Sequence, residues 1–162
     1  MKHLLIITSV FFLFSCQSAY YTTMEKFGIE KRDILVDRVE DAKESQEDAQ
    51  QKFSSALEKF IQLTNYDGGK LQEVYEDLND QFKVSQDSAD RVSSRINKVE
   101  TVADDLFKEW AEEIDKYSSL KLRRNSQVKF KDTQKRYHSL LKAMRKAESK
   151  MAPVLIAMQD NV

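Results

Sequence analysis

The chain has 162 residues but only 3 glycines and 1 proline, and its 26 Lys and Arg residues nearly balance 27 Asp and Glu residues, for a net charge of −1. Average usage would give about 19 Gly and Pro residues in a chain of this length. An antiparallel sheet needs a turn roughly every 8 to 12 residues. The composition therefore argues against all-β and α/β folds and favours a few long, exposed helices.

The N-terminal 15 residues differ from the rest of the chain. A basic segment at 1–3 precedes an uncharged apolar run over 4–14, and the small Ser15 stands before Cys16. Eleven helical residues span about 16 Å, whereas the hydrocarbon core of a bilayer is about 30 Å thick. The pattern predicts a signal peptide over residues 1–15 rather than a permanent transmembrane helix.

Leu13-Phe14-Ser15-Cys16 resembles the lipobox of bacterial lipoproteins. The resemblance implies cleavage between Ser15 and Cys16 and acylation of Cys16, including an amide-linked chain such as palmitate. Two or more chains give stable anchoring, because each buried methylene contributes about 0.8 kcal/mol. Gln17 is not the aspartate that marks inner-membrane retention, so the resemblance implies the periplasmic face of the outer membrane. The alternative is a lone buried cysteine at the end of an apolar run.

The mature chain divides into a lipidated tether over 16–24 and a helical domain over 25–162. Helices are expected at about 25–66, 70–117 and 126–160. The first follows a Thr22-x-x-Glu25 capping box and carries a heptad repeat, a pattern typical of a coiled coil. Its members are Leu35, Val39, Ala42, Gln46, Ala49, Phe53, Ala56, Phe60 and Leu63. Leu57 and Ile61 widen this stripe, which suits more than one packing partner.

The second predicted helix follows the Gly68-Gly69 turn and shows two interleaved heptad seams. They are Leu71, Leu78, Ser85, Val92, Val99 and Leu106, and Tyr75, Phe82, Ala89, Ile96, Ala103, Trp110 and Tyr117. Trp110 is interpreted as a core residue rather than part of a ligand pocket, because it falls on the repeat.

The third predicted helix follows a lapse of the pattern over 118–126, where a kink, a short loop or a register change remain open. Its seams are Phe130, Tyr137, Met144, Met151 and Met158, and Thr133, Leu140, Ala147 and Val154. Pro153 predicts a kink or a new helix start near Met151-Ala152.

Charge is unevenly distributed along the helices. Residues 25–116 carry 14 Lys and Arg against 24 Asp and Glu, a net charge of −10, whereas residues 121–150 carry 11 against 2, a net charge of +9. The basic third helix either lies against the acidic hairpin or contacts lipid phosphates. In the second case the contacts would be made by Arg123, Arg124, Lys129, Lys131, Lys135 and Arg136. Nucleic acid is not an expected partner of a secreted protein.

Residues for chemistry are scarce. His138 is the single histidine of the mature chain and has cationic neighbours, so neither a metal site nor a Ser-His-Asp arrangement is expected. The pairs Asp104-Asp105 and Glu112-Glu113 do not face one another on a helix and are interpreted as solvated. There is no glycine-rich phosphate loop. We therefore predict no catalytic, metal or cofactor-binding residues and no enzyme.

Several runs together resemble a family of proteobacterial lipoproteins catalogued as a domain of unknown function, DUF2959. They are residues 30–39, the Gly68-Gly69 turn, 95–100, 106–110 and 151–155. The resemblance implies an α-helical, coiled-coil-like envelope protein with no site residues to carry over. Family members continue past the Pro153 region into a further helical stretch, so it also implies a C-terminally short member.

The sequence thus predicts an all-α, elongated, antiparallel, coiled-coil-like three-helix bundle anchored to the membrane through lipid on Cys16. The expected function is a non-enzymatic scaffold or adaptor that binds an envelope protein through its helix faces. A holdase-like periplasmic chaperone, or a membrane-surface module that binds anionic lipid through the basic third helix, are the alternatives. Helix faces of this kind also allow a homo-oligomer.

Overall fold

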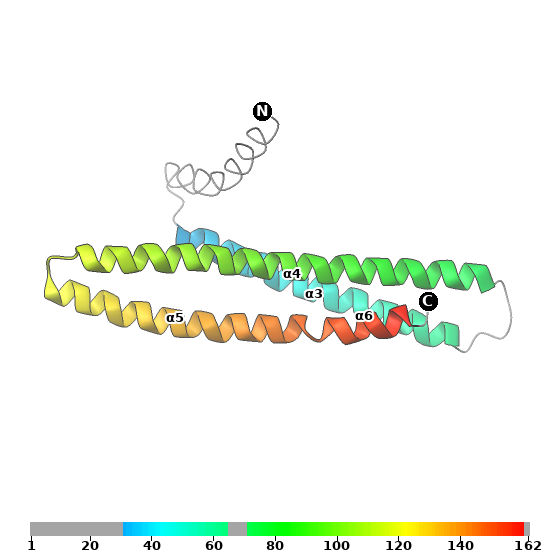
Figure 1. The fold of residues 1–162 in the computed structure, drawn as a ribbon. Helices are drawn as coiled ribbons and strands as arrows, with labels where there is room; N and C mark the ends of the chain where they lie inside the picture. Colours follow the sequence, from blue (N-terminus) through cyan, green and yellow to red (C-terminus); the bar gives the residue numbers. More distant parts are fainter. Residues whose placement is uncertain (1–30, 65–70, 161–162) are drawn as a thin grey trace, which may run out of the picture.

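The computed structural model describes residues 31–64 and 71–160, and all of its elements in these ranges are helices. They are α3 (Lys31–Thr64), α4 (Leu71–Lys116), α5 (Leu120–Glu148) and α6 (Met151–Gln159). The predicted all-α, elongated, antiparallel bundle is confirmed: α3 and α4 run in opposite directions, and α5 and α6 return along α4 as the third arm (Figure 1). The predicted capping box and the Gly68-Gly69 turn lie outside the described residues.

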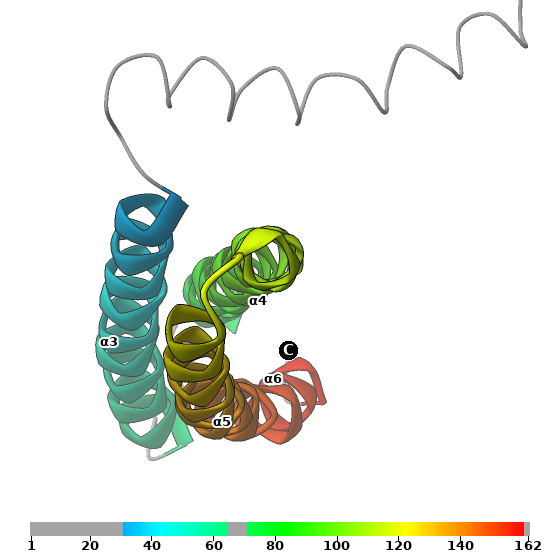
Figure 2. The same ribbon diagram turned by 90° about the vertical axis from the view of Figure 1, so that its left-hand side faces the viewer.

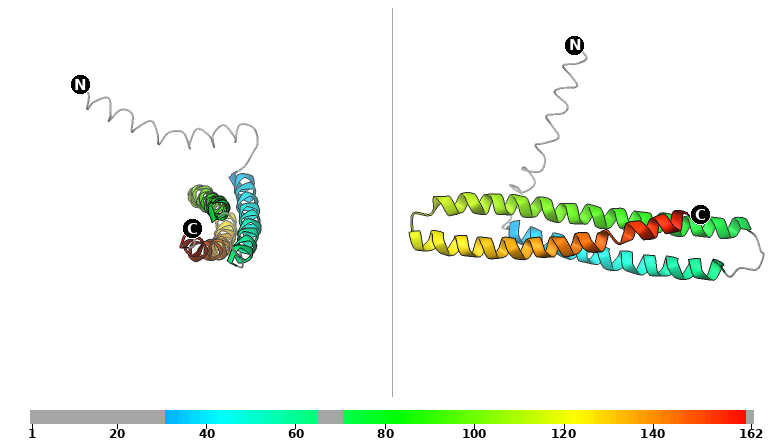
Figure 3. Two further views of the ribbon diagram at one scale, coloured as in Figure 1. Left: turned by 90° about the vertical axis from the view of Figure 1, so that its right-hand side faces the viewer. Right: turned by 60° about the horizontal axis from the view of Figure 1, so that its bottom comes forward.

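The longest helix, α4, organises the bundle. Its 46 residues span about 69 Å at the α-helical rise. The three arms pack unequally: α4 contacts α3 more extensively than it contacts α5, and all three helices share one core cluster. The end-on view shows the three arms, with α3 inclined across the α4–α5 hairpin (Figure 2). Further views show α6 continuing the third arm beside α4 (Figure 3).

Small side chains let α3 and α4 approach closely. Ala42, Ala49 and Ala56 follow one another at intervals of seven residues on α3 and are fully buried. On α4, Ser85 and Ser88 are also fully buried. Ala42 and Ala49 share a core cluster with Val92, Ile96 and Val99, so a heptad of alanines brings the two backbones together and leaves little room for larger side chains in this layer.

The burial pattern of α4 corrects the predicted heptads. Most of its buried side chains step by three, four and four residues and so follow an 11-residue repeat: Ser85, Ser88, Val92, Ile96, Val99, Ala103, Phe107 and Ile114. Val102 is buried in addition, in a small cluster with Ile34 of α3. Phe107 is buried where Leu106 was predicted, and the seam members Tyr75 and Tyr117 are exposed. The physical reason is that an 11-residue repeat corresponds to about 3.67 residues per turn, close to the 3.6 of a straight helix, whereas a 3.5 period drifts.

Only one of the two seams predicted for the third arm is buried. Tyr137, Met144 and Met158 face the core, with Phe130 and Met151 half-buried. The other predicted seam is wrong, since its four members are exposed: Thr133, Leu140, Ala147 and Val154. The reason is that α5 packs mainly on α4 and meets α3 only locally, as in the hydrogen bond from Gln46 to the Met144 carbonyl, so most of a second apolar stripe finds no partner helix within the described chain.

The third arm begins at Leu120, six residues before the predicted start, after a turn without Gly or Pro. Ser119 caps α5 by accepting a hydrogen bond from the Leu122 N–H at 3.4 Å. The Arg123 guanidinium donates to the main-chain carbonyls of Asp115 (3.0 Å) and Tyr117 (2.9 Å) at the end of α4. These bonds satisfy the backbone groups at the two helix ends without a glycine. Of the predicted lapse over 118–126, only the first residues belong to a short loop, at 117–119, and the rest are the first turns of α5.

The third arm is also interrupted where Pro153 predicted it. A turn at Ser149 and Lys150 ends α5, and α6 begins at Met151. Pro153 is the third residue of α6, and first-turn residues have no intrahelical acceptor for an N–H. The missing donor of proline is therefore tolerated there.

Ion pairs fix the register of α3 against α4. Arg95 donates to Asp41 at 2.8 Å, and Lys31 pairs with Glu109. The second pair places the beginning of α3 beside the last turns of α4, at the end of the bundle that holds the α4–α5 turn.

Candidate functional site

The predicted lipidation residue Cys16 and cleavage residue Ser15 lie outside the described residues. In the described ranges, no group of three or more His, Cys, Asp or Glu side chains is placed to hold a metal ion. Among the same residues, no helix combines the length and apolar character needed to cross a membrane.

The few residues with chemical potential lie apart from one another. His138 is exposed on α5, with its ring centroid 5.4 Å from that of Tyr137. Asp104, Glu112 and Glu113 are exposed on α4. The structure therefore brings no acid, base and nucleophile together among these predicted candidates.

Trp110 packs in the α4–α5 interface. Its ring meets Phe130 edge to face at 5.6 Å, and its indole Nε1 donates to Ser126 Oγ at 2.9 Å. It contacts the main core cluster and is half-buried. The side chain thus fills a helix interface, as the heptad interpretation indicated.

Tyr137 is the most perturbed titratable group among the described residues. Burial, together with the negative charges of Asp104 and Glu100, raises the pKa of its hydroxyl to about 12. The phenol is therefore neutral at physiological pH and serves as a packing residue.

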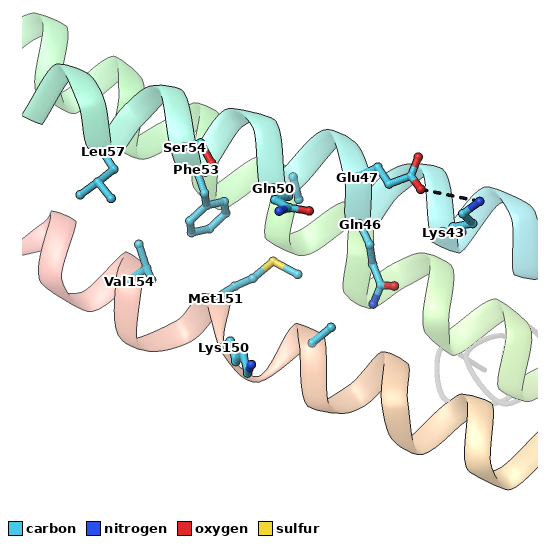
Figure 4. A pocket seen from close by; sticks show the side chains of 12 residues that line it. Lys43, Gln46, Glu47, Gln50, Phe53, Ser54, Leu57, Lys150, Met151 and Val154 are labelled. Atoms are coloured by element: carbon cyan, nitrogen blue, oxygen red, sulfur yellow. Dashed lines mark ion pairs between the residues drawn. The ribbon is translucent and has the colours of Figure 1, made fainter.

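An open groove lies between α3 and the junction of α5 with α6 (Figure 4). Its volume is about 630 Å³. Phe53 and Leu57 extend into it from α3, and Met151 and Val154 face them from α6. We call these four side chains the groove residues.

A hydrogen bond closes one end of this groove. Gln46, the polar member of the predicted α3 seam, donates through Nε2 to the Met144 main-chain oxygen of α5 at 3.2 Å. Beyond it the two walls separate, and Leu57 is 57% exposed. The rim is polar, with Lys43 and Glu47 paired at 3.7 Å on one wall and Lys150 on the other.

The solvent face of α5 is strongly basic. Eight exposed cations lie on this helix against one exposed acid, Asp132. The cations are Lys121, Arg124, Lys129, Lys131, Lys135, Arg136, Lys142 and Lys146. Within the described ranges, none of the eight side chains forms an ion pair, and only Arg145 links the basic helix to an acid of α4, Glu100. Arg145 is therefore the one cation of α5 that pairs with an acid of α3 or α4 among the described residues.

The α4–α5 turn exposes large apolar side chains. Leu120 is 80% and Leu122 is 55% exposed, and both flank Lys121 in the first turn of α5. Tyr117 and Val128 are also exposed close by. We call residues 117–124 the hairpin tip.

Sequence reasoning missed the groove and the hairpin tip in different ways. Leu57 and Val154 carried a signal, since both belong to apolar stripes that exceed what one partner covers. For the hairpin tip, the sequence shows only an interruption of the heptad repeat. Leu120 and Leu122 are recognised as unusual only from their exposure in the structure.

Comparisons with known proteins define the family of the chain. No curated protein matches it with significance, and no solved structure does so either. A family model described as "Protein of unknown function (DUF2959)" matches residues 20–162. Because this match covers nearly all of the helical domain, the chain belongs to the DUF2959 family.

Proposed function

We propose that this protein is a lipid-anchored scaffold of the bacterial cell envelope that holds a helix of a partner protein in the groove between α3 and α6. The observation that carries the proposal is the groove itself, with apolar walls on two arms and an open long side. The lipobox-like segment ending at Cys16 supports the anchor, and the family of unknown function adds no competing activity.

The shape and lining of the groove favour a helix as occupant. Its walls are two helical arms that run in roughly the same direction, and a third helix laid between them would complete the packing that α5 leaves open toward α3. The groove residues supply aromatic, aliphatic and thioether surface, and thioethers adapt to different partners. The paired Lys43 and Glu47 supply a polar rim.

Occupancy is tested by a photocrosslinking amino acid placed at Leu57 in the full chain in its native envelope. The matched control position is Lys59, which is exposed and lies about 200° further around the same helix. We expect crosslinks from position 57 to one apolar helical segment of an envelope protein, mapped by mass spectrometry, and none from position 59.

The substitution Val154→Glu on the opposite wall should abolish the crosslink from position 57, because it places a charge in the apolar groove. Equal labelling from positions 57 and 59, insensitivity to Val154→Glu, or crosslinks only to a second copy of the chain would each contradict the proposal.

The anchor is tested independently. Metabolic labelling with an alkyne fatty acid should mark the wild-type chain, and Cys16→Ala should remove both the label and retention in the membrane fraction. Continued labelling of Cys16→Ala contradicts lipidation at this residue.

A further inference from the structure

We propose that the hairpin tip is a membrane-contact element, which docks Leu120 and Leu122 into the surface of an anionic bilayer. The inference rests on the proposed lipid anchor for its geometry. It adds a second attachment point that defines which end of the bundle meets the membrane.

The apolar residues of the tip are unusually exposed for a helix start. Leu120 and Leu122 have little packing within the described chain, although residues of this type are among the most frequently buried in proteins. Tyr117 lies beside them in the turn and is partly exposed. Two leucines and a tyrosine at a convex end match the composition of side chains that enter the headgroup and upper acyl region.

The charges around these leucines match an anionic surface. Lys116, Lys121 and Arg124 surround the tip and are exposed, and the basic face of α5 continues from it. In the described chain, Lys121 and Arg124 have no ion-pair partner that would have to be broken on binding. Glu112, Glu113 and the exposed Asp115 all lie on the α4 side of the turn, so the α5 side of the tip faces the lipid.

The hairpin tip lies at the same end of the bundle as the beginning of α3, from which the chain leads back to Cys16. This position favours the bilayer as the surface that the tip contacts. The pairing of Lys31 with Glu109 places the start of α3 about 10 Å from the end of α4, measured along the helix axis. The opposite end of α4, at Leu71, lies about 57 Å from the same point. The segment from Cys16 to Lys31 can span at most roughly 50 Å. A lipid on Cys16 therefore allows an upright bundle to meet the bilayer with the hairpin tip but not with the far end.

The test uses full-length, processed protein reconstituted into protein-free vesicles. A fluorophore is attached at Ser118→Cys in the turn or, as the control, at Asp77→Cys, about 60 Å away along α4. Both positions are exposed and leave the leucines intact. Quenching by doxyl groups on acyl chains then reports the contact of each label with lipid. Cys16 is the single natural cysteine, so labelling of the wild-type chain reports whether its thiol is free.

We expect strong quenching at position 118 and none at position 77 in vesicles of phosphatidylethanolamine and phosphatidylglycerol. The effect should be weaker in phosphatidylcholine and in high salt, because surface attraction is screened. Lys121→Gln with Arg124→Gln should lower the ratio of docked to undocked tip by about 30-fold, since each cation near an anionic surface contributes roughly a factor of five. Leu120→Ser with Leu122→Ser should remove quenching even at low salt.

The outcomes separate the two proposals. Lipid labelling of Cys16 without quenching at position 118, or equal quenching at positions 118 and 77, overturns the docking of the tip and leaves the anchor intact. A free thiol at Cys16 together with quenching at position 118 overturns the anchor and supports the tip. Unchanged quenching in the leucine variant also overturns the inference.

Discussion

Trp110 and Ser126 join α4 to α5 through a hydrogen bond of 2.9 Å from the indole Nε1 to the serine Oγ. The two residues are 16 positions apart and lie on opposite sides of the hairpin turn. The same indole ring stands edge to face against Phe130. One side chain therefore combines aromatic packing with a polar bond that fixes the register of the two helices.

Ser126→Ala is expected to destabilise the protein by about 1 kcal/mol, because it leaves the half-buried indole donor without its acceptor. The measurement is urea unfolding followed by circular dichroism and by fluorescence of Trp110, the single tryptophan. Ser139→Ala is the matched control. The Ser139 hydroxyl is exposed and only donates to the Lys135 carbonyl of its own helix, so its loss should be nearly neutral. Equal effects of both substitutions would show that the interhelical bond contributes nothing.

The helical fold could be predicted because glycine and proline are so few that long helices are almost the only remaining arrangement. The 11-residue repeat of α4 could not be predicted, because it shares Ser85, Val92 and Val99 with a heptad repeat. The two repeats differ only toward the ends of the helix. The exposure of Tyr75 and the burial of Phe107 in place of Leu106 reveal the difference. The start of α5 escaped prediction because Arg123 caps carbonyls six and eight residues earlier, a contact that leaves no local sequence signal.

The groove illustrates a different limit of sequence reasoning. A heptad seam predicts that a helix face needs a partner, but it does not say whether that partner belongs to the same chain. Ala147 and Val154 fit a seam as well as Met144 does, yet only Met144 is buried. Which of these residues is buried depends on the position of α5 relative to α3. Packing of both helices on α4 sets that position.

Two fully buried serines on α4 should respond in opposite directions to alanine substitution. Within the part of the chain that the structure describes, the Ser85 hydroxyl has no hydrogen-bond partner, whereas Ser88 Oγ accepts a bond from Arg91 at 2.9 Å. Ser85→Ala removes an unsatisfied buried group and should stabilise the fold by about 1 kcal/mol. Ser88→Ala should destabilise it by about 0.5 to 1 kcal/mol. The denaturant midpoints of the two variants, compared with the wild type, measure both effects. Destabilisation by Ser85→Ala would show that the Ser85 hydroxyl forms a stabilising hydrogen bond.

The turn between α4 and α5 should depend on one guanidinium. Arg123→Gln loses the charged donor to the Asp115 and Tyr117 carbonyls and should destabilise the protein by about 1 kcal/mol, since a cation also favours the C-terminal end of α4. Arg124→Gln is the control, because that side chain is exposed. Thermal unfolding of both variants measures the difference, and hydrogen exchange at the last turn of α4 should increase only in Arg123→Gln.

The alanine layer between α3 and α4 should resist enlargement. Ala49→Leu inserts three carbon atoms where the side chain is 1% exposed, and overpacking of this kind typically destabilises by about 1 to 3 kcal/mol. Gln51→Leu, at an exposed position of the same helix, should change stability by less than about 0.5 kcal/mol. Urea unfolding compares the two. A tolerated leucine at position 49 would mean that α3 can move away from α4 without loss.

Stability should fall in strongly alkaline solution through the ionisation of Tyr137. The folded pKa is raised from 10.0 to about 12, first by burial and then by Asp104 and Glu100, with Arg145 acting in the opposite direction. The fold therefore favours the neutral phenol, its contribution is complete below pH 10, and it is lost as pH rises from 10 toward 12. Urea midpoints of wild type and Tyr137→Phe across this range isolate the effect from other groups that titrate there. The wild type should lose more stability than Tyr137→Phe, because phenylalanine keeps the ring contacts with Phe107 and has no proton to lose. Parallel pH profiles for the two proteins would show that this hydroxyl titrates alike in the folded and unfolded chains.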